Sequence, residues 1–329
     1  MSKPTIEDVA RNAGVSKVTA GRVLAGSPLH DAEVQARVEQ AIAGMDERPN
    51  SLSAGAGSLI ALCHDGANPQ FALAVQQGIL EAITGSEFAL AVPALTGDPA
   101  EALRAFIRHH TPAGVLLLSP LSEDAALVDL CREELCDYVR IGASPLDHVD
   151  HLIASNDREA AAQAVGYLVS LGHRRIGIVA GPENSLTAQE RELGYLDAMA
   201  DHDLDRGPAL IAGGDFSFAS GMTAGRLLLE VSPRPTAIFA CNDAMAAGVL
   251  HAAREKNIVV PADLSIMGFE DVSPAAEVWP PLTTMRLPLR KMASAAALKA
   301  AYPEAAGQAP THFRAKLVER GSTGPVKES

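Results

Sequence analysis

The chain of 329 residues has few cysteines, few aromatic residues and no excess of positive charge. Its four cysteines include no pair at CxxC spacing, and no group of cysteines and histidines has the spacing of a zinc site. No apolar stretch reaches 18 residues, and the charged N-terminus lacks the apolar segment of a secretory signal. We therefore expect reduced thiols in the core, no metal, no membrane segment and a cytoplasmic location.

The net charge of −13 argues against nucleic-acid binding by the chain as a whole, because phosphate binding depends on clustered lysines and arginines. The charge is unevenly distributed. Residues 1–49 contain six basic and seven acidic residues and are almost neutral, so nearly all the excess acid lies in the other 280 residues. Residues 9–30 contain three basic residues and no acidic one, which is compatible with one basic face on a small helical unit.

The sequence also lacks a recognisable catalytic arrangement. It contains no GxSxG, HExxH or Walker A motif, so we expect neither an enzyme nor a bound cofactor. His109 and His110 stand near the end of a predicted helix and are interpreted as solvated residues. His173, in Gly172–Arg175, is interpreted as a structural histidine at a helix stop.

The first 49 residues show the pattern of three short helices. Thr5 to Asp8 matches the helix-start pattern in which a hydroxyl and a carboxylate cap the first turn. Gly14 ends this helix, the Ser16 hydroxyl caps a second helix, and Asp31 caps a third. Each predicted helix has an apolar face, made by Ile6, Val9, Ala10 and Ala13, by Val15, Ala20, Val23 and Leu24, and by Val34, Val38, Ala41, Ile42 and Met45.

Three helices with a glycine between the first and the second are typical of a helix-turn-helix. Its second helix enters the major groove and presents its N-terminal residues to the bases. Lys17 and Val18 lead that helix here. Arg22 lies one turn further on, within reach of a guanine or a phosphate. The alternative is a helical hairpin that only packs on a neighbouring domain, and the pattern alone leaves both interpretations open.

From Leu59 onward, short β-rich runs alternate with helical stretches. We expect strands at residues 59–63, 88–92, 114–118, 138–142, 175–179, 236–240 and 264–268. We expect helices at residues 70–84, 98–109, 123–135, 157–171, 187–202, 218–230, 243–256 and 289–302. This alternation predicts parallel sheets covered on both faces. Because the strands are too many for one compact sheet, we expect two doubly wound subdomains with a ligand cleft at the carboxyl ends of their strands.

The segments TIEDVARNAGVSKVTAGRVLAG and ARVEQAIAGMDERPN resemble the DNA-binding headpiece of the LacI/GalR (lactose-repressor/galactose-repressor) family of bacterial transcription regulators. Four positions depart from the usual family residues: Ala20 stands in place of Val, Gly21 of Ser, Ala25 of Asn and Glu47 of Tyr. Gly21 lowers helix propensity by about 1 kcal/mol and removes a hydroxyl that can reach phosphate. The resemblance implies contacts to DNA from Thr5, Ser16, Lys17, Val18, Thr19, Arg22, Asn50 and Leu52.

The resemblance extends over essentially the whole chain through DREAAAQAVGYLVSLGHRRIGIVAG, FACNDAMAAGVL, LSIMGFEDV and LVERGST. It implies a periplasmic-binding-protein-like effector domain that forms homodimers and whose bound small molecule changes the affinity for a pseudo-palindromic operator. By position, the effector contacts fall on Phe71, Asp157, Arg191, Phe216, Asn242 and Glu270. Glu270 departs from the usual family Asp. An aromatic face together with Arg, Asn and carboxylates suits sugar hydroxyls or ring nitrogens, and a sugar or sugar derivative is preferred over a purine.

The expected fold is therefore an all-α helix-turn-helix headpiece followed by an α/β effector domain of two doubly wound parallel-sheet subdomains. The expected boundaries are residues 1–49 for the headpiece, 50–58 for a hinge and 59–329 for the effector domain. Within the effector domain, the N-subdomain takes about 59–153 and 285–307, and the C-subdomain about 154–284 and 308–329.

Residues 53–58, Ser-Ala-Gly-Ala-Gly-Ser, raise the alternative of a phosphate-binding loop. Such a loop needs a strand before its glycines and a helix after them, whereas here a predicted helix precedes and a strand follows. We therefore interpret the segment as a joint. The resemblance implies a hinge helix with a Leu wedged into the minor groove, but Ala56 takes that position here. We hypothesise that no regular hinge helix forms, or that Leu52 replaces the wedge.

The preferred function is a sequence-specific transcriptional regulator, with repression preferred over activation, whose operator affinity is controlled by a small molecule. The alternatives are a small-molecule sensor with weakened or lost DNA binding and an α/β enzyme, which the missing catalytic motifs disfavour. Trp279, the only tryptophan, is assigned either to the mouth of the cleft or to the dimer contact.

Overall fold

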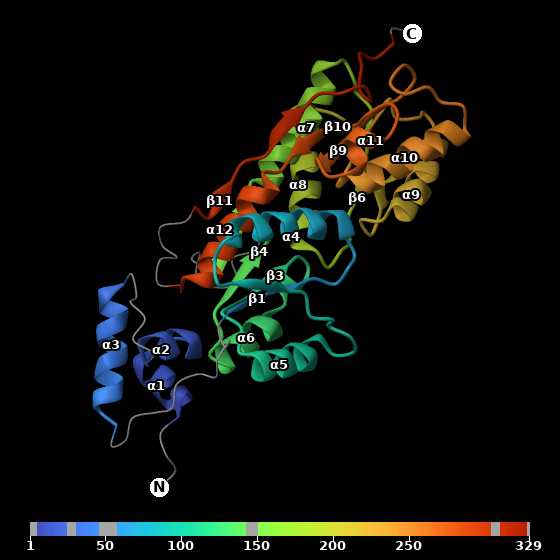
Figure 1. Ribbon diagram of the computed structural model, residues 1–329. Coiled ribbons are helices and arrows are strands. Elements are labelled where there is room, and N and C mark those ends of the chain that lie inside the picture. The colour runs from blue at the N-terminus through green and yellow to red at the C-terminus, as the bar shows by residue number, and fades with distance from the viewer. Residues whose placement is uncertain (1–4, 25–30, 46–57, 143–150, 304–309, 328–329) are drawn as a thin grey trace. The chain divides into compact units, whose positions relative to one another are not determined.

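The computed structural model describes residues 5–24, 31–45, 58–142, 151–303 and 310–327 (Figure 1). The chain divides into two compact units. Unit 1 consists of Met1–Asp65, Val75–Ile153 and Arg290–Thr311, and unit 2 of Gly66–Ala74, Ala154–Leu289 and His312–Ser329. Within the described ranges, no helix is both long enough and apolar enough to span a bilayer.

Three helices open the chain, as predicted. They are α1 (Ile6–Ala13), α2 (Lys17–Leu24) and α3 (Ala32–Ala43). The Thr5 hydroxyl accepts the Asp8 amide at 3.3 Å, and the Asp8 carboxylate accepts the Thr5 amide at 2.7 Å, so the predicted capping box is present. α1 ends at Gly14, whose φ of 63° is a left-handed conformation that glycine adopts without a side-chain clash.

The other two predicted caps of this segment are also confirmed. Ser16 Oγ accepts the Thr19 amide at 3.1 Å, and Asp31 Oδ1 accepts two amides in the first turn of α3. The Arg37 guanidinium on α3 donates to the carbonyls of Ala13 and Gly14, which ties α3 to the turn between α1 and α2. The three helices enclose a small apolar core, whose fully or nearly buried members are Val9, Ala10, Ala13, Ala20 and Val38.

Unit 1 contains a parallel sheet with the order β2-β1-β3-β4-β5. Its strands are β1 (Leu59–Cys63), β2 (Ala89–Ala91), β3 (Gly114–Leu118), β4 (Tyr138–Ile141) and β5 (Leu152–Ser155). Its helices are α5 (Pro99–His110) and α6 (Ala125–Glu133), with the short 3₁₀ helix η1 (Leu121–Glu123). Two more helices, α4 (Pro69–Ile83) and α12 (Leu289–Ala301), begin in unit 2 and continue in unit 1 from Val75 and Arg290. The last two residues of β5, Ala154 and Ser155, belong to unit 2 and pair there with β11 (His312–Phe313).

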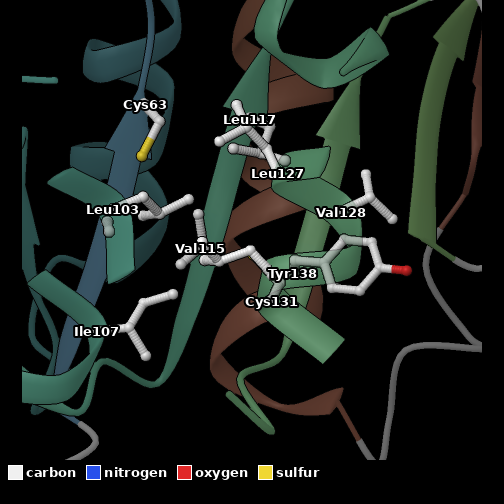
Figure 2. Packing of buried hydrophobic residues seen from close by; sticks show 11 residues of the cluster. Cys63, Leu103, Ile107, Val115, Leu117, Leu127, Val128, Cys131 and Tyr138 are labelled. Carbon is white, nitrogen blue, oxygen red and sulfur yellow. The ribbon is translucent and has the colours of Figure 1, made fainter. Parts of the chain in front are cut away.

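Alternate residues of β3 face opposite sides of this sheet. Val115 and Leu117 pack with Leu103 and Ile107 of α5 and with Leu127 of α6 (Figure 2). Gly114 points the other way, where an added Cβ would lie 2.9 Å from the Cβ of Ala300 in α12. α5 and α6 therefore cover one face of the sheet and α12 covers the other, as expected for a doubly wound unit.

The four cysteines are free thiols, as predicted. Cys63 and Cys131 lie in the core between the sheet and helices α5 and α6 (Figure 2). Burial raises the pKa of the Cys63 thiol to about 12, and it raises the pKa of Cys241 in unit 2 to about 12 as well. The protein therefore keeps these sulfurs protonated and unreactive near neutral pH.

Unit 2 repeats the same strand order, β7-β6-β8-β9-β10, and adds β12 antiparallel to β10. Its strands are β6 (Ile176–Ala180), β7 (Ile211–Gly213), β8 (Ala237–Ala240), β9 (Ser265–Glu270), β10 (Thr283–Arg286) and β12 (Lys316–Val318). Its helices are α7 (Asp157–Ser170), α8 (Leu186–Asp201), α9 (Phe218–Glu230), α10 (Asp243–Glu255) and α11 (Pro274–Glu277), with the 3₁₀ helix η3 (Pro208–Leu210). α7 packs on α8, and α9 packs on α10.

All seven predicted strands and all eight helices predicted after Leu59 are present, with end residues that differ by a few positions. The prediction omitted β5, β7, β10, β11, β12 and α11, which are elements of two to four residues. The prediction of two sheets made mainly of parallel strands is nonetheless confirmed.

Candidate functional sites

A cluster of buried charged residues lies in unit 2 where β8 and β9 end. Arg191 of α8 donates through Nε to Asp157 Oδ1 at 2.7 Å and through Nη1 to Glu270 Oε1 at 3.0 Å. Nη1 also donates to the carbonyl of Cys241 at 2.7 Å. The side chains of Arg191, Asp157 and Glu270 are only 1%, 3% and 2% exposed. The structure thus brings two of the predicted effector contacts, Asp157 and Glu270, onto a third, Arg191.

This cluster contains two carboxylates and one guanidinium. Burial disfavours the charged form of Arg191, but the two carboxylates outweigh burial and raise the pKa of its guanidinium. Burial raises the pKa of Glu270, although Arg191 and an amide of Asn68 oppose this. The ring of Phe269 lies beneath the guanidinium, 4.2 Å from its central carbon. Because Arg191 is the ion partner of both carboxylates, its removal leaves Asp157 and Glu270 without a counter-charge, whereas removal of one carboxylate leaves Arg191 paired with the other.

A close approach of two helices makes the cluster possible. An added Cβ at Gly194 of α8 would lie 2.1 Å from the carbonyl oxygen of Arg158 in α7. Gly194 is one turn beyond Arg191, and Arg158 follows Asp157. The absence of a side chain at position 194 therefore lets α8 bring Arg191 against Asp157.

Glu270 has a second partner that the sequence prediction missed. Asn68 Nδ2 donates to Glu270 Oε1 at 3.1 Å and to Oε2 at 3.0 Å. Asn68 Oδ1 accepts the amide of Phe71 at 3.3 Å, so the same side chain caps the first turn of α4. An Asn directly before a Pro at a helix start is a local signal for a cap, but nothing local connects it with a residue 202 positions away.

Phe216 and Asn242 form a second pair in unit 2. Phe216 has a φ of 68° and is 8% exposed. Asn242 Nδ2 donates to the Phe216 carbonyl at 2.9 Å, while its Oδ1 accepts the Met245 amide at 2.9 Å as the N-cap of α10. Asn242 follows Cys241, whose carbonyl binds Arg191, so the backbone joins the Phe216–Asn242 pair to the Arg191 cluster.

All six predicted effector residues belong to unit 2.

The residues predicted to read DNA lie at the start of α1 and in α2. Thr5 and Ser16 act as helix caps, and Ser16 Oγ and Thr19 Oγ1 lie 3.0 Å apart. The Lys17 ammonium pairs with Glu7 at 2.7 Å. Asn50 and Leu52 lie outside the described residues, because the structure does not describe residues 46–57. Of the predicted hinge, residues 50–58, it describes Ser58 only, so the hinge hypothesis stays a prediction.

Several of these residues have neighbours elsewhere in unit 1. The Lys17 amide donates to the Leu135 carbonyl at 3.1 Å, and Arg22 lies over the rings of Phe88 and Tyr302 at 5.6 Å from each centroid. Val18 is 5% exposed and Thr19 is 4% exposed. In this arrangement, groups of the same chain occupy the surface that the sequence prediction assigns to DNA.

The remaining singled-out residues have ordinary surroundings. His173 is buried and makes hydrogen bonds with Ser265, Thr236 and the Gly324 carbonyl, which confirms a structural histidine. His109 and His110 are exposed at the end of α5, as predicted. Trp279 is 78% exposed, and its carbonyl accepts Arg254 Nη2 at 3.1 Å.

Two family profiles match the chain. Residues 5–50 match the profile described as "Bacterial regulatory proteins, lacI family". Residues 165–323 match a "Periplasmic binding protein-like domain". Together with the two sheets, these matches confirm the predicted fold class.

Individual relatives agree over nearly full length. An "Uncharacterized HTH-type transcriptional regulator in aml 5'region" of Streptomyces limosus is 32% identical over 97% of this chain and 94% of its own. The ribose operon repressor of Haemophilus influenzae is 30% identical over 86% of this chain and 87% of its own. Among solved structures, a complex of the transcriptional regulator CelR with cellobiose has a TM-score of 0.71 at 28% identity, covering 97% of this chain and 100% of that chain.

Proposed function

The chain belongs to the lacI family of bacterial regulatory proteins, and on that premise we propose that its headpiece binds an operator while a sugar held by unit 2 sets the affinity. Family membership confirms the prediction of a transcriptional regulator rather than an enzyme. As a repressor, the protein would act as a homodimer on a pseudo-palindromic site in the cytoplasm, where bacterial DNA is found.

One observation carries the effector half of the proposal: Asp157, Arg191 and Glu270 form a buried, mutually paired cluster, with Asn68 on both oxygens of Glu270. Carboxylates and a guanidinium held this rigidly suit a ligand with several hydroxyls, and Phe71 or Phe216 supplies an aromatic face for a sugar ring. The CelR structure contains cellobiose and another relative represses a ribose operon, which supports a sugar over a purine.

Thermal unfolding of the full chain with cellobiose, D-ribose, D-glucose, D-galactose and adenine tests this half. A ligand at 100 times its Kd stabilises the protein by about 2.7 kcal/mol. We expect one of the sugars to raise the Tm, the variant Glu270→Gln to lose at least tenfold in affinity, and the exposed control Glu277→Gln to bind normally. Stabilisation by adenine alone, or equal binding by Glu270→Gln, would refute the proposed sugar site.

The DNA half depends on α2. Its first turn carries Lys17, and its N-terminus is capped by Ser16, as in helices that present their first residues to bases. Binding to a duplex requires that Lys17 and Arg22 give up their contacts with Leu135, Phe88 and Tyr302. These contacts would therefore couple DNA binding by the headpiece to the conformation of the rest of unit 1.

A gel shift on the DNA upstream of the protein's own gene tests this half at two salt concentrations. We expect Lys17→Ala to weaken binding about 5- to 100-fold and the exposed control Lys316→Ala to have no effect. The burial of Val18 and Thr19 favours a second candidate, a sugar sensor with little DNA affinity. That candidate predicts no shift even at low ionic strength, although a sugar still raises the Tm.

A further inference from the structure

The Glu270 carboxylate is presented by an unusual piece of backbone. Glu270 has a φ of 101° and Asp271 a φ of 59°, so two consecutive residues with side chains adopt left-handed conformations. Such conformations cost free energy and persist only where the surroundings hold them. The groups that hold this turn therefore determine where the carboxylate lies.

Asp243, the first residue of α10, holds the turn from inside unit 2. Its Oδ2 accepts the amide of Val272 at 2.8 Å, directly after the two left-handed residues. Its Oδ1 accepts the Thr284 hydroxyl of β10 at 2.6 Å. Asp243 is fully buried, and an added Cβ at Gly268 of β9 would lie 2.3 Å from Oδ1. The carboxylate thus touches β9, the turn and β10 at once.

Two arginines hold the same turn from the outer side. Arg320 Nη2 donates to Asp271 Oδ1 at 2.6 Å, and Arg286 Nε donates to Asp271 Oδ2. Both pairs are more exposed than Asp243, because the side chains of Arg320 and Arg286 are 18% and 54% exposed. Water therefore competes for the outer contacts more than for the inner ones.

We propose that Asp243 is a positioning residue of the effector site, which holds Glu270 and Asp271 in their left-handed conformations so that the Glu270 carboxylate stays on Arg191. The label of effector site rests on the proposed function. Asn242 does the same for Phe216, whose φ is also positive, by donating to its carbonyl. The two residues at the N-terminus of α10 therefore hold both strained loops of the site.

The test uses protein labelled with ¹⁵N-arginine, in which the Arg191 guanidinium signals are assigned with Arg191→Lys. Hydrogen exchange is measured separately at Nη1, which faces Glu270, and at Nε, which faces Asp157. In Asp243→Ala we expect at least a tenfold faster exchange at Nη1 and less than a threefold change at Nε. General loosening of the fold would accelerate both sites equally.

Two further variants separate positioning from stability. Thr284→Val removes only the contact to β10 and is expected to change Nη1 exchange less than threefold. Asp243→Asn can still accept the Val272 amide through its side-chain carbonyl while its amide donates to Thr284, so it should rescue the wild-type pattern. Unchanged Nη1 exchange in Asp243→Ala, equal acceleration at Nε, or failure of Asn to rescue would overturn the proposal.

A measurement on the wild-type chain gives an independent check if Asp243→Ala does not fold. The Val272 amide should exchange at least a hundredfold more slowly than an unstructured amide, and any smaller slowing would overturn the proposal. These readouts need neither DNA nor sugar. Their failure therefore leaves the regulatory function untouched, and the absence of operator binding leaves them valid.

Discussion

The two units share one strand order, but their non-glycine residues with a left-handed backbone conformation stand at different places in the chain. In unit 1, among the residues described, these are Thr111 and Leu135, which stand at the ends of helices α5 and α6. Unit 2 has two at the ends of helices as well, but Phe216 and Asp271 follow strands and Glu270 is the last residue of one. The Phe216 carbonyl and the Glu270 carboxylate belong to the candidate site. A left-handed residue at a helix end is common. In unit 2 such residues also stand at the ends of strands, where the candidate site lies.

The two units also differ in how deeply they bury their clusters of paired charges. In unit 1, Glu134 pairs with Arg104 and Arg108, whose side chains are 28% and 63% exposed. In unit 2, Arg191 is 1% exposed. Solvent reaches the arginines of the first cluster, although Glu134 itself is 7% exposed, whereas every member of the second is buried. The comparison predicts that equivalent substitutions will have unequal effects.

The largest difference is expected between Arg191→Ala and Arg104→Ala. Loss of Arg191 leaves two buried carboxylates unpaired and should lower the free energy of unfolding by about 3–5 kcal/mol. Loss of Arg104 leaves Glu134 with Arg108 and should cost at most about 1 kcal/mol. Urea denaturation at pH 7.5 measures both. Equal losses would show that burial does not distinguish the two clusters.

A smaller contrast is expected when glycine replaces a left-handed residue. Thr111→Gly removes the steric cost of a helix end and should stabilise the protein by about 0.5–1 kcal/mol. Phe216→Gly gains the same relief but loses a buried aromatic ring, so a net loss of about 2–4 kcal/mol is expected. Thermal unfolding gives both signs, and stabilisation by Phe216→Gly would contradict a packed role for that ring.

The smallest effect concerns pH. Burial lowers the pKa of His173 below its ordinary value of 6.5, so the folded state keeps this ring neutral. As the pH falls below about 6.5, the unfolded chain binds a proton that the folded chain does not. Stability is therefore lost from there downward, at no more than about 1.4 kcal/mol per pH unit.

Denaturation at pH 7.5, 6.5 and 5.5 measures this loss as a difference between variants. His173→Gln should remove it, while His151→Gln in unit 1, where the ring is only half-buried, should keep it. If the free energy of unfolding of His173→Gln falls with pH as steeply as that of the wild type, other groups cause the pH dependence.

Local signals predicted the fold well. Thr5 with Asp8, Ser16 and Asp31 show their helix starts in the sequence itself, and Gly14 shows a helix end, because capping depends on residues three or four apart. Strands such as β5, β7 and β10 were missed since they have only three or four residues, and their pairing with neighbouring strands decides their conformation.

The site was less accessible to local reasoning. The family resemblance placed Asp157, Arg191 and Glu270, but Asn68 was missed because its link to Glu270 spans 202 residues. Asp243 was also missed, since a carboxylate in the first turn of a helix is already explained by the helix dipole. Its second role appears only when β9 and β10 lie beside α10.

The buried thiols have a practical consequence for spectroscopy. Cys63, Cys131 and Cys241 are enclosed, and the pKa of the half-buried Cys136 is also raised well above its usual value by burial. The native chain should thus react slowly with maleimides at neutral pH. A cysteine introduced at exposed Leu80 in unit 1 and another at exposed Leu227 in unit 2 would accept a fluorophore pair. Energy transfer between the dyes would then test whether a sugar changes the distance between the two labelled positions, without prior removal of any native sulfur.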